Sequence, residues 1–252
     1  MRQTLGMNAS DAFEHELEIF RIEAEAAAQF LYAYLSVHET AGRHPEVVGL
    51  LNTAPLFWNT NLGALQTSAF IVLGRIFDQD SPHNIDRVLR IAQQHPEIFS
   101  LDALAARKQG KSAVRPDWLD DFLAKSYAPS PSDFRRLRKE VSKHRKIYEE
   151  KYKDIRRKVF AHKEVVGAAE VGALFAKTNI RELQLLITFM WSLYDAFWQL
   201  FFNGNRIVLR QRRYSVKAMR NRPTPQGRMQ TIQERITHEV AHFLRAAAMP
   251  MR

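Results

Sequence analysis

Helical periodicity runs through nearly the whole chain and constrains the fold more than any other feature. Apolar residues recur at three- and four-residue steps, whereas the alternation of a half-buried strand is nearly absent. In residues 11–40 these steps place one set of side chains on a single helix face: Phe13, Leu17, Phe20, Ala24, Ala27, Leu31 and Leu35. The pattern predicts an all-α protein, a bundle of long antiparallel helices with extra short helices.

Gly42 and Pro45 are predicted to end the first helix, and capping residues, glycines and prolines set the bounds of the other predicted helices. Shorter helices are expected at residues 61–77, 85–94, 101–108, 116–126 and 231–247. Longer helices at 132–162 and 179–202 are predicted to form a central antiparallel pair. Residues 108–115, 128–131 and 165–177 are predicted as connections because of their Gly, Ser, Pro and other small residues.

The most apolar segment, residues 183–202, is about long enough to span a bilayer. Gln184, Asp195 and Gln199 interrupt it, and a charge inside lipid is costly. We interpret it as the central helix of a bundle or as part of a dimer interface. Residues 1–10 lack the apolar core of a signal peptide, and the chain has no cysteine. We therefore expect a cytoplasmic protein without disulfides, thiolate metal sites or a membrane partner.

The net charge of +10 is concentrated in the second half of the chain: residues 1–130 contribute −5 and residues 131–252 contribute +15. Such asymmetry favours a polyanionic partner over the alternative of a basic solubilising surface. No acidic residue lies between residues 206 and 228, and Pro223 and Pro225 predict a loop or arm there. The candidate nucleic-acid-binding residues of this arm are Arg206, Arg210, Arg212, Arg213 and Lys217. The alternative for this arm is a disordered basic loop.

Residues 154–163 read DIRRKVFAHK and lie between the basic helix and the apolar helix. Here the chain resembles the HEPN superfamily, whose members are helical bundles with an Arg, four to six residues, and then a His. Arg157 and His162 fit with four residues between them, and Arg156 fits with five. The sequence RRKVFAHKE is most similar to the AbiU-type abortive-infection branch, which Arg75-Ile-Phe-Asp78 also resembles. The similarity in helix order covers roughly residues 12–205.

The resemblance implies a homodimer, a cleft between two copies of the motif, and RNA cleavage without a metal or cofactor. It gives Arg157 and His162 the catalytic roles. The supporting residues are Asp154, Arg156, Lys158 and Lys163. A toxin-like or antiviral ribonuclease would take RNA as its substrate and could have an antitoxin protein as a partner.

This residue pair suits the chemistry of RNA cleavage by its own 2′-hydroxyl. Histidine moves protons near neutral pH, and arginine stays charged beside the phosphate. Five positions on an ideal α-helix rotate about 140°, so Arg157 and His162 point in different directions there. Their convergence would need a frayed helix end or a second subunit. The alternative is that His162 is a satisfied interior histidine, following Ile155 and Val159 on an apolar stripe, with Arg157 on a solvated face.

Other residues offer competing motifs. Arg90–His95, Arg138–His144 and Arg235–His242 have similar spacing. His238-Glu-Val-Ala-His242 matches a zinc-protease pattern, with Glu239 as the general base. No third ligand follows in the remaining residues, so we assign no metal site. The chain also has no glycine-rich phosphate loop or nucleophilic serine elbow.

Two hypotheses of function remain. One is a metal-independent endoribonuclease, and the other is a non-catalytic helical module that binds nucleic acid or protein. Residues 1–205 are predicted to form a HEPN-like helical domain. Residues 206–252 would form a basic arm and a final helix packed on the same domain.

Overall fold

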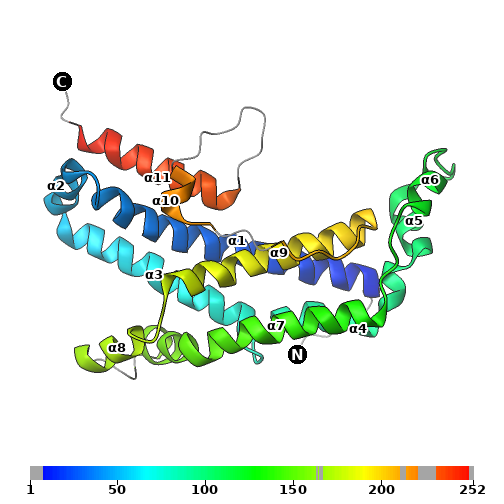
Figure 1. Cartoon of the computed structure of the whole chain (residues 1–252), viewed down its shortest axis with the longest axis horizontal. Helices are drawn as coiled ribbons and strands as arrows, with labels where there is room; N and C mark the ends of the chain where they lie inside the picture. Colours follow the sequence, from blue (N-terminus) through cyan, green and yellow to red (C-terminus); the bar gives the residue numbers. More distant parts are fainter. Residues whose placement is uncertain (1–7, 163, 165–166, 211–213, 221–230, 250–252) are drawn as a thin grey trace. The chain divides into compact units, whose positions relative to one another are not determined.

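The computed structural model describes residues 8–162, 164, 167–210, 214–220 and 231–249 (Figure 1). Helices account for 79% of these residues, and none of them is in a strand. The prediction of an all-α helical bundle is therefore confirmed. The helices are, in chain order, α1 Ala9–Ala41, α2 Pro45–Thr53, α3 Pro55–Phe77, α4 Ile85–Gln94, α5 Leu101–Gln109, α6 Leu119–Ala124, α7 Pro131–Lys151, α8 Ala168–Phe175, α9 Ile180–Asn203, α10 Val216–Arg220 and α11 Ile232–Ala248. A 3₁₀ helix covers Pro96–Phe99, and a π-helix covers Ile155–Ala161.

The chain divides into two compact units, each built from three segments. The first unit comprises Met1–Ile22, Arg75–Glu149 and Thr188–Gln211, and the second comprises Glu23–Gly74, Glu150–Ile187 and Arg212–Arg252. Four of the boundaries fall inside helices α1, α3, α7 and α9. The predicted division at residue 205 stays a prediction.

Aromatic side chains fill the core of the first unit. Phe13 of α1 packs against Phe99, Phe197 and Phe201, with ring centroids 5.1, 5.6 and 5.0 Å away. Phe134 at the start of α7 joins the cluster through Phe99, at 5.4 Å. Offset and edge-on ring contacts of this kind add to the stabilisation from burying apolar area.

The second unit holds α11 against α1 and α2. Val37, Val47 and Leu244 form a buried cluster between these helices. The Thr231 hydroxyl and the Glu234 carboxylate form a capping box that starts α11. The predicted helix at residues 231–247 is thus present in a packed position.

Helices α7 and α9 run antiparallel, as predicted. In the first unit, Tyr127 just before α7 donates its backbone N–H to the carbonyl of Gly204 just after α9, at 2.6 Å. Further along, the His144 ring of α7 stacks on the Phe189 ring of α9, with centroids 3.7 Å apart. Residue numbers thus rise along α7 as they fall along α9.

Gly204 is required where α9 ends. Its φ of +60° lies in the left-handed region that favours glycine. A Cβ at this position would also lie 2.6 Å from Leu104 Cδ2 and 2.7 Å from Ser126 Cβ. The predicted helix stop at residues 203–205 therefore has both a backbone reason and a packing reason.

Helix α9 is the one helix in the described ranges that is long and apolar enough to cross a membrane, judged by length and composition. However, 61% of its most apolar window is buried inside the protein. This burial agrees with the interpretation of α9 as a core helix.

Several predictions of local structure are wrong. Pro45 does not only stop α1: it occupies the first turn of α2, where its missing N–H costs no hydrogen bond. Helix α3 likewise begins at Pro55 rather than at residue 61. The predicted connection at 165–177 contains α8, and the predicted basic loop contains α10, whose Val216 and Met219 are buried. The long basic helix ends at Lys151, before the π-helix begins.

Candidate functional site

The Arg157–His162 motif lies in the π-helix of the second unit. The His162 backbone N–H donates to the Arg157 carbonyl, five residues earlier, at 2.9 Å. Arg90 and His95 have the same spacing in sequence, but His95 N–H donates to the carbonyl of Ile91, four residues earlier, at 2.9 Å. A π turn holds more residues than an α turn, so it rotates residues five apart by less than the about 140° of an α-helix. Arg157 and His162 therefore lie nearer to the same helix side within one chain than an ideal α-helix predicts.

Packing inside the second unit explains the π turn. Ile155 is fully buried, and Phe160, five residues later, lies against Phe70 of α3, with ring centroids 5.0 Å apart. Phe160 also meets Phe175 of α8 at 6.2 Å. An α-helix would hold Ile155 and Phe160 about 140° apart, so it could not turn both toward the interior. The same turn leaves Arg157 and His162 at the surface.

A buried tyrosine anchors the chain just before the π-helix. Tyr152 is fully buried, and its hydroxyl donates to the Asn179 carbonyl at 2.8 Å and accepts from the Asn179 N–H at 3.2 Å. Burial raises the pKa of Tyr152, so the hydroxyl stays protonated at neutral pH. Lys151 also forms an ion pair with Glu182 in the first turn of α9. These contacts hold the residues just before the π-helix against the start of α9.

The candidate catalytic side chains are accessible. Both Arg157 and His162 are exposed, so the alternative of a satisfied interior position for His162 is wrong. Arg157 Nε lies 3.7 Å from Glu164 Oε1, a loose and solvent-screened pair. Lys158 donates to Asp154 at 2.9 Å, one turn earlier on the same side of the chain. Lys163 lies outside the described residues.

Arg156 differs from Arg157 in its surroundings. Its guanidinium lies against Gly74 of α3, in the second unit, where a Cβ on the glycine would come within 2.6 Å of Arg156 Nε. Arg156 is half-buried, whereas Arg157 is exposed. The sequence left open which of the two arginines pairs with His162. In the structure Arg156 packs on α3, whereas Arg157 faces solvent. The sequence did not single out Gly74, because Gly63 of the same helix, where a Cβ meets nothing within 4 Å, gives the same signal.

Replacing Gly74 by alanine is expected to leave the free energy of unfolding nearly unchanged. Displacing the flexible end of Arg156 offsets the gain of about 1 kcal/mol in helix propensity. Gly63 of the same helix is the matched control, because a Cβ there meets nothing within 4 Å. Gly63→Ala should stabilise the protein by about 0.5–1 kcal/mol. Urea unfolding of both variants measures the difference, and equal shifts would contradict the packing of Arg156 on Gly74.

His144 is the interior histidine of the molecule. It is 1% exposed, its Nδ1–H donates to the Glu140 carbonyl at 2.8 Å, and its ring is stacked on Phe189 with the planes 2° apart. Burial lowers the pKa of His144, which keeps the ring neutral. The Arg138–His144 spacing is therefore no candidate site, because its histidine cannot reach a substrate.

The zinc-protease motif on α11 lacks a complete ligand set in the structure. His242 and Glu239 are exposed, and Glu239 forms an ion pair with Arg235 at 3.1 Å. His238 instead lines a shallow pocket with the cationic side chains of Arg43 and Arg245. Within the described ranges, no group of three or more His, Asp or Glu side chains could hold a metal ion.

Three of the predicted nucleic-acid-binding residues of the arm are described, Arg206 and Arg210 in the first unit and Lys217 in the second, and each is exposed. Arg206 lies over the Tyr127 ring at 5.6 Å in the first unit, and Arg210 is exposed. Lys217 is exposed on α10, a helix tied to α1 by a 3.1 Å hydrogen bond from the Tyr32 hydroxyl to the carbonyl of Tyr214. Arg212 and Arg213 lie outside the described residues.

Comparison with known proteins gives one match. The HEPN family model described as AbiU2 matches residues 10–219, which is most of the chain and includes the whole π-helix. No curated protein and no solved structure matches the chain.

Proposed function

The chain belongs to the AbiU2 family of HEPN proteins, and we propose that it is a metal-independent endoribonuclease of the toxin or antiviral-defence type. One observation supports the proposal: Arg157 and His162 are both exposed, and a 2.9 Å hydrogen bond from His162 N–H to Arg157 O joins their backbones across a π turn. π turns occur often at functional sites. The other Arg–His pair with four intervening residues, Arg90–His95, lacks this turn.

The two side chains supply complementary parts of the reaction. His162 accepts the proton of the RNA 2′-hydroxyl, and the 2′ oxygen attacks the adjacent phosphorus. The guanidinium of Arg157 stabilises the charge that develops on the phosphate oxygens. The bond from phosphorus to the 5′ oxygen then breaks, and that oxygen takes a proton from solvent. The products are a 2′,3′-cyclic phosphate and a 5′-hydroxyl.

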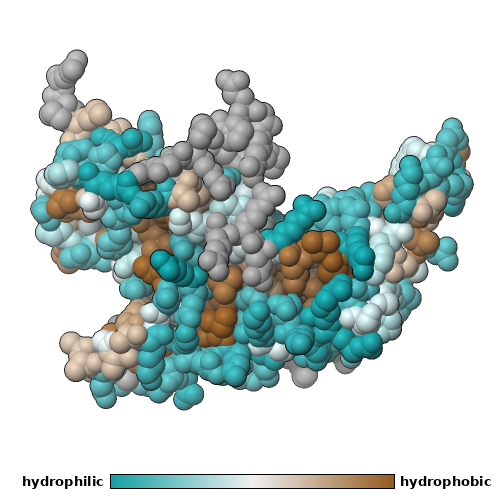
Figure 2. All heavy atoms as spheres, viewed as in Figure 1, coloured by the Kyte–Doolittle hydropathy of each residue, from teal (hydrophilic) through white to brown (hydrophobic). Residues whose placement is uncertain are grey.

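The proposal includes a homodimer, with an antitoxin protein as a further partner. Helix α8 packs beside the π-helix through Phe175 and Phe160, yet none of its residues is buried. Hydrophobic side chains gather at the surface at its position (Figure 2, lower left). Ile180, at the start of α9, is 55% exposed. An apolar surface beside the motif supports a second copy bound there, because such patches mark protein interfaces.

The purified protein is expected to cut labelled single-stranded RNA in the presence of EDTA. The products should carry cyclic phosphate ends, because the attacking group is the 2′-hydroxyl of the RNA. A strand with a single 2′-deoxy substitution at the cut position is the control and should remain intact there. Loss of cleavage in EDTA, or cleavage of the deoxy control, would contradict the proposal. RNA binding without any cleavage would instead favour the non-catalytic binding module, which the basic half of the chain also suits.

A further inference from the structure

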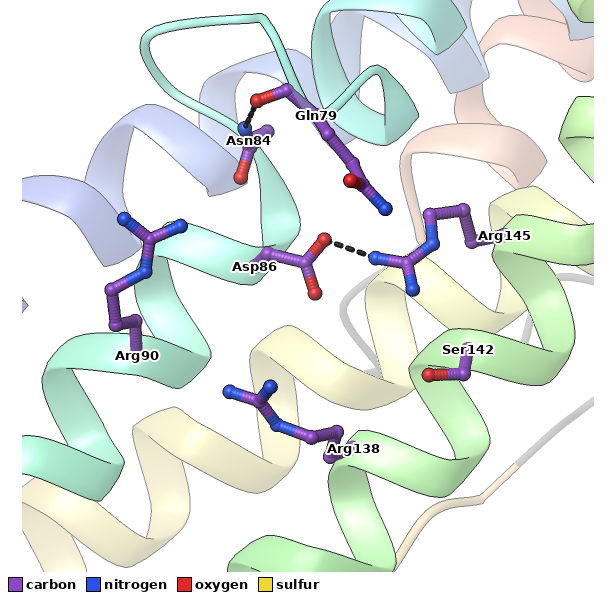
Figure 3. A pocket seen from close by; sticks show the side chains of 7 residues that line it. All are labelled: Gln79, Asn84, Asp86, Arg90, Arg138, Ser142 and Arg145. Atoms are coloured by element: carbon purple, nitrogen blue, oxygen red, sulfur yellow. Dashed lines mark hydrogen bonds and ion pairs between the residues drawn. The ribbon is translucent and has the colours of Figure 1, made fainter.

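A polar pocket in the first unit lies between α4 and α7 (Figure 3). Its volume is about 230 Å³. Asp86 and Arg90 of α4 are four residues apart, and Arg138, Ser142 and Arg145 of α7 are four and three residues apart. This spacing puts each set on one helix side, facing the other. Gln79 and Asn84, which precede α4, complete the lining.

One arginine of the pocket has a structural role. Arg145 forms an ion pair with Asp86, and the two side chains are only 17% and 18% exposed. Its Nε also lies 3.8 Å from Glu149 Oε1. The Asp86 carboxylate lies in the middle of the pocket, between Arg145 and Arg90 (Figure 3). Arg145 therefore holds α4 and α7 together and contributes little net charge to a ligand.

The other two arginines keep their charge. Arg138 donates to Gln93 Oε1, a neutral amide, so its charge is not compensated. Arg90 forms no ion pair with a residue in the described part of the chain. Both side chains are exposed, which leaves their guanidinium groups accessible from solvent. With Arg145, Asp86 and Glu149 counted, the pocket keeps a net positive charge.

We propose that this pocket binds a phosphate group of the single-stranded RNA, with Arg90 and Arg138 as the main ligands. Guanidinium groups match phosphate oxygens with paired hydrogen bonds, and the Ser142 hydroxyl and the Gln79 amide offer neutral donors beside them. A lipid headgroup fits less well, since no large apolar side chain lines the pocket to enter a membrane. The inference rests on the proposed function for the identity of the ligand. The pocket itself lies in the first unit and shares no residue with the Arg157–His162 motif of the second unit. The pocket adds affinity and takes no part in the chemistry.

The test compares RNA binding by two double variants in a His162→Ala background, which keeps the strand intact. Arg90→Gln/Arg138→Gln removes the two free charges of the pocket. Lys111→Gln/Lys125→Gln removes two charges from exposed positions of the same unit outside the pocket, and is the matched control. Fluorescence anisotropy with a labelled 12-nucleotide strand is measured over a series of salt concentrations.

The pocket variant should bind about tenfold more weakly at low salt, equally for strands of different sequence. Its slope of log affinity against log salt should fall by about 0.7 for each phosphate group that the variant no longer binds. The lysine variant should keep nearly the affinity and slope of the parent. Ser142→Glu gives an independent check, because a negative charge in the pocket should weaken RNA binding as strongly without removing an arginine.

Equal affinity and slope in the pocket variant and the lysine control would overturn the inference, as would a parent protein that binds no RNA. Failure of the pocket assignment can be distinguished from failure of the proposed function. If the pocket variants bind weakly but the wild-type protein never cleaves RNA, the pocket assignment holds and the nuclease proposal fails. If they bind normally while His162→Ala abolishes cleavage, the pocket assignment fails and the nuclease proposal holds.

Discussion

Replacing His162 by alanine is expected to lower the rate of RNA cleavage by about three orders of magnitude, because general acid–base catalysis contributes about 10²–10⁴-fold. RNA affinity should change by less than about twofold, since lysine and arginine charges supply most of the affinity for phosphate groups. The side chain is exposed, so its loss opens no cavity and the melting temperature should stay close to that of the wild type. Gel-resolved cleavage of labelled RNA at saturating protein measures the rate.

His95→Ala is the matched control for this result. His95 also follows an arginine after four residues, but its backbone N–H bonds the fourth residue back, and its ring pairs with Glu97 at 3.0 Å. Cleavage by His95→Ala should equal that of the wild type. Wild-type cleavage by His162→Ala, or an equal loss in both variants, would refute the assignment of the π-helical pair.

Replacing Arg157 by alanine is expected to slow cleavage by about 10²–10³-fold, the effect of removing one donor that stabilises a transition-state charge. RNA binding should also weaken severalfold, because alanine offers no charge to the phosphate that we propose Arg157 binds. Arg157→Lys should recover part of the rate, since lysine keeps the charge but lacks the paired geometry of the guanidinium. The rate at saturating RNA and the affinity are measured separately, by single-turnover cleavage and by anisotropy.

Arg156→Ala tests which of the two arginines acts. Arg156 packs on Gly74 and is half-buried, so its removal should lower the melting temperature while each folded molecule keeps its cleavage rate. A loss of rate in Arg156→Ala with a normal rate in Arg157→Ala would reverse the assignment. It would place the functional spacing at five intervening residues instead of four.

Local signals predicted the helices whose ends have strong capping groups. Asn84 accepts from the Arg87 N–H at the start of α4, and Thr231 forms a capping box with Glu234 at the start of α11. Both helices begin within one residue of the predicted position. Pro45 was predicted only to end α1. It also begins α2, because proline suits the first turn of a helix.

The type of turn at the motif depended on residues distant in the sequence. From apolar spacing alone, the apolar stripe of the basic helix was expected to continue through Val159 to His162. The structure ends that stripe at Ile155, because Phe160 packs against Phe70 and Phe175 from two other helices. The periodicity of one helix carries no information about the residues of other helices, so it could not predict this packing.

The sequence by itself determined the helical class, the antiparallel pair, the concentration of basic charge and the candidate Arg–His residues. The helices follow from the periodicity of apolar residues and the charge from composition, whereas the Arg–His candidates follow from the resemblance to the HEPN superfamily. Only the tertiary structure decided that His144 is buried and His162 exposed, and that Arg157, not Arg156, shares the exposed side with His162. The reason is that burial and the choice between an α and a π turn depend on partners such as Phe70, Gly74 and Phe189, which meet the motif and α7 only when the chain is folded.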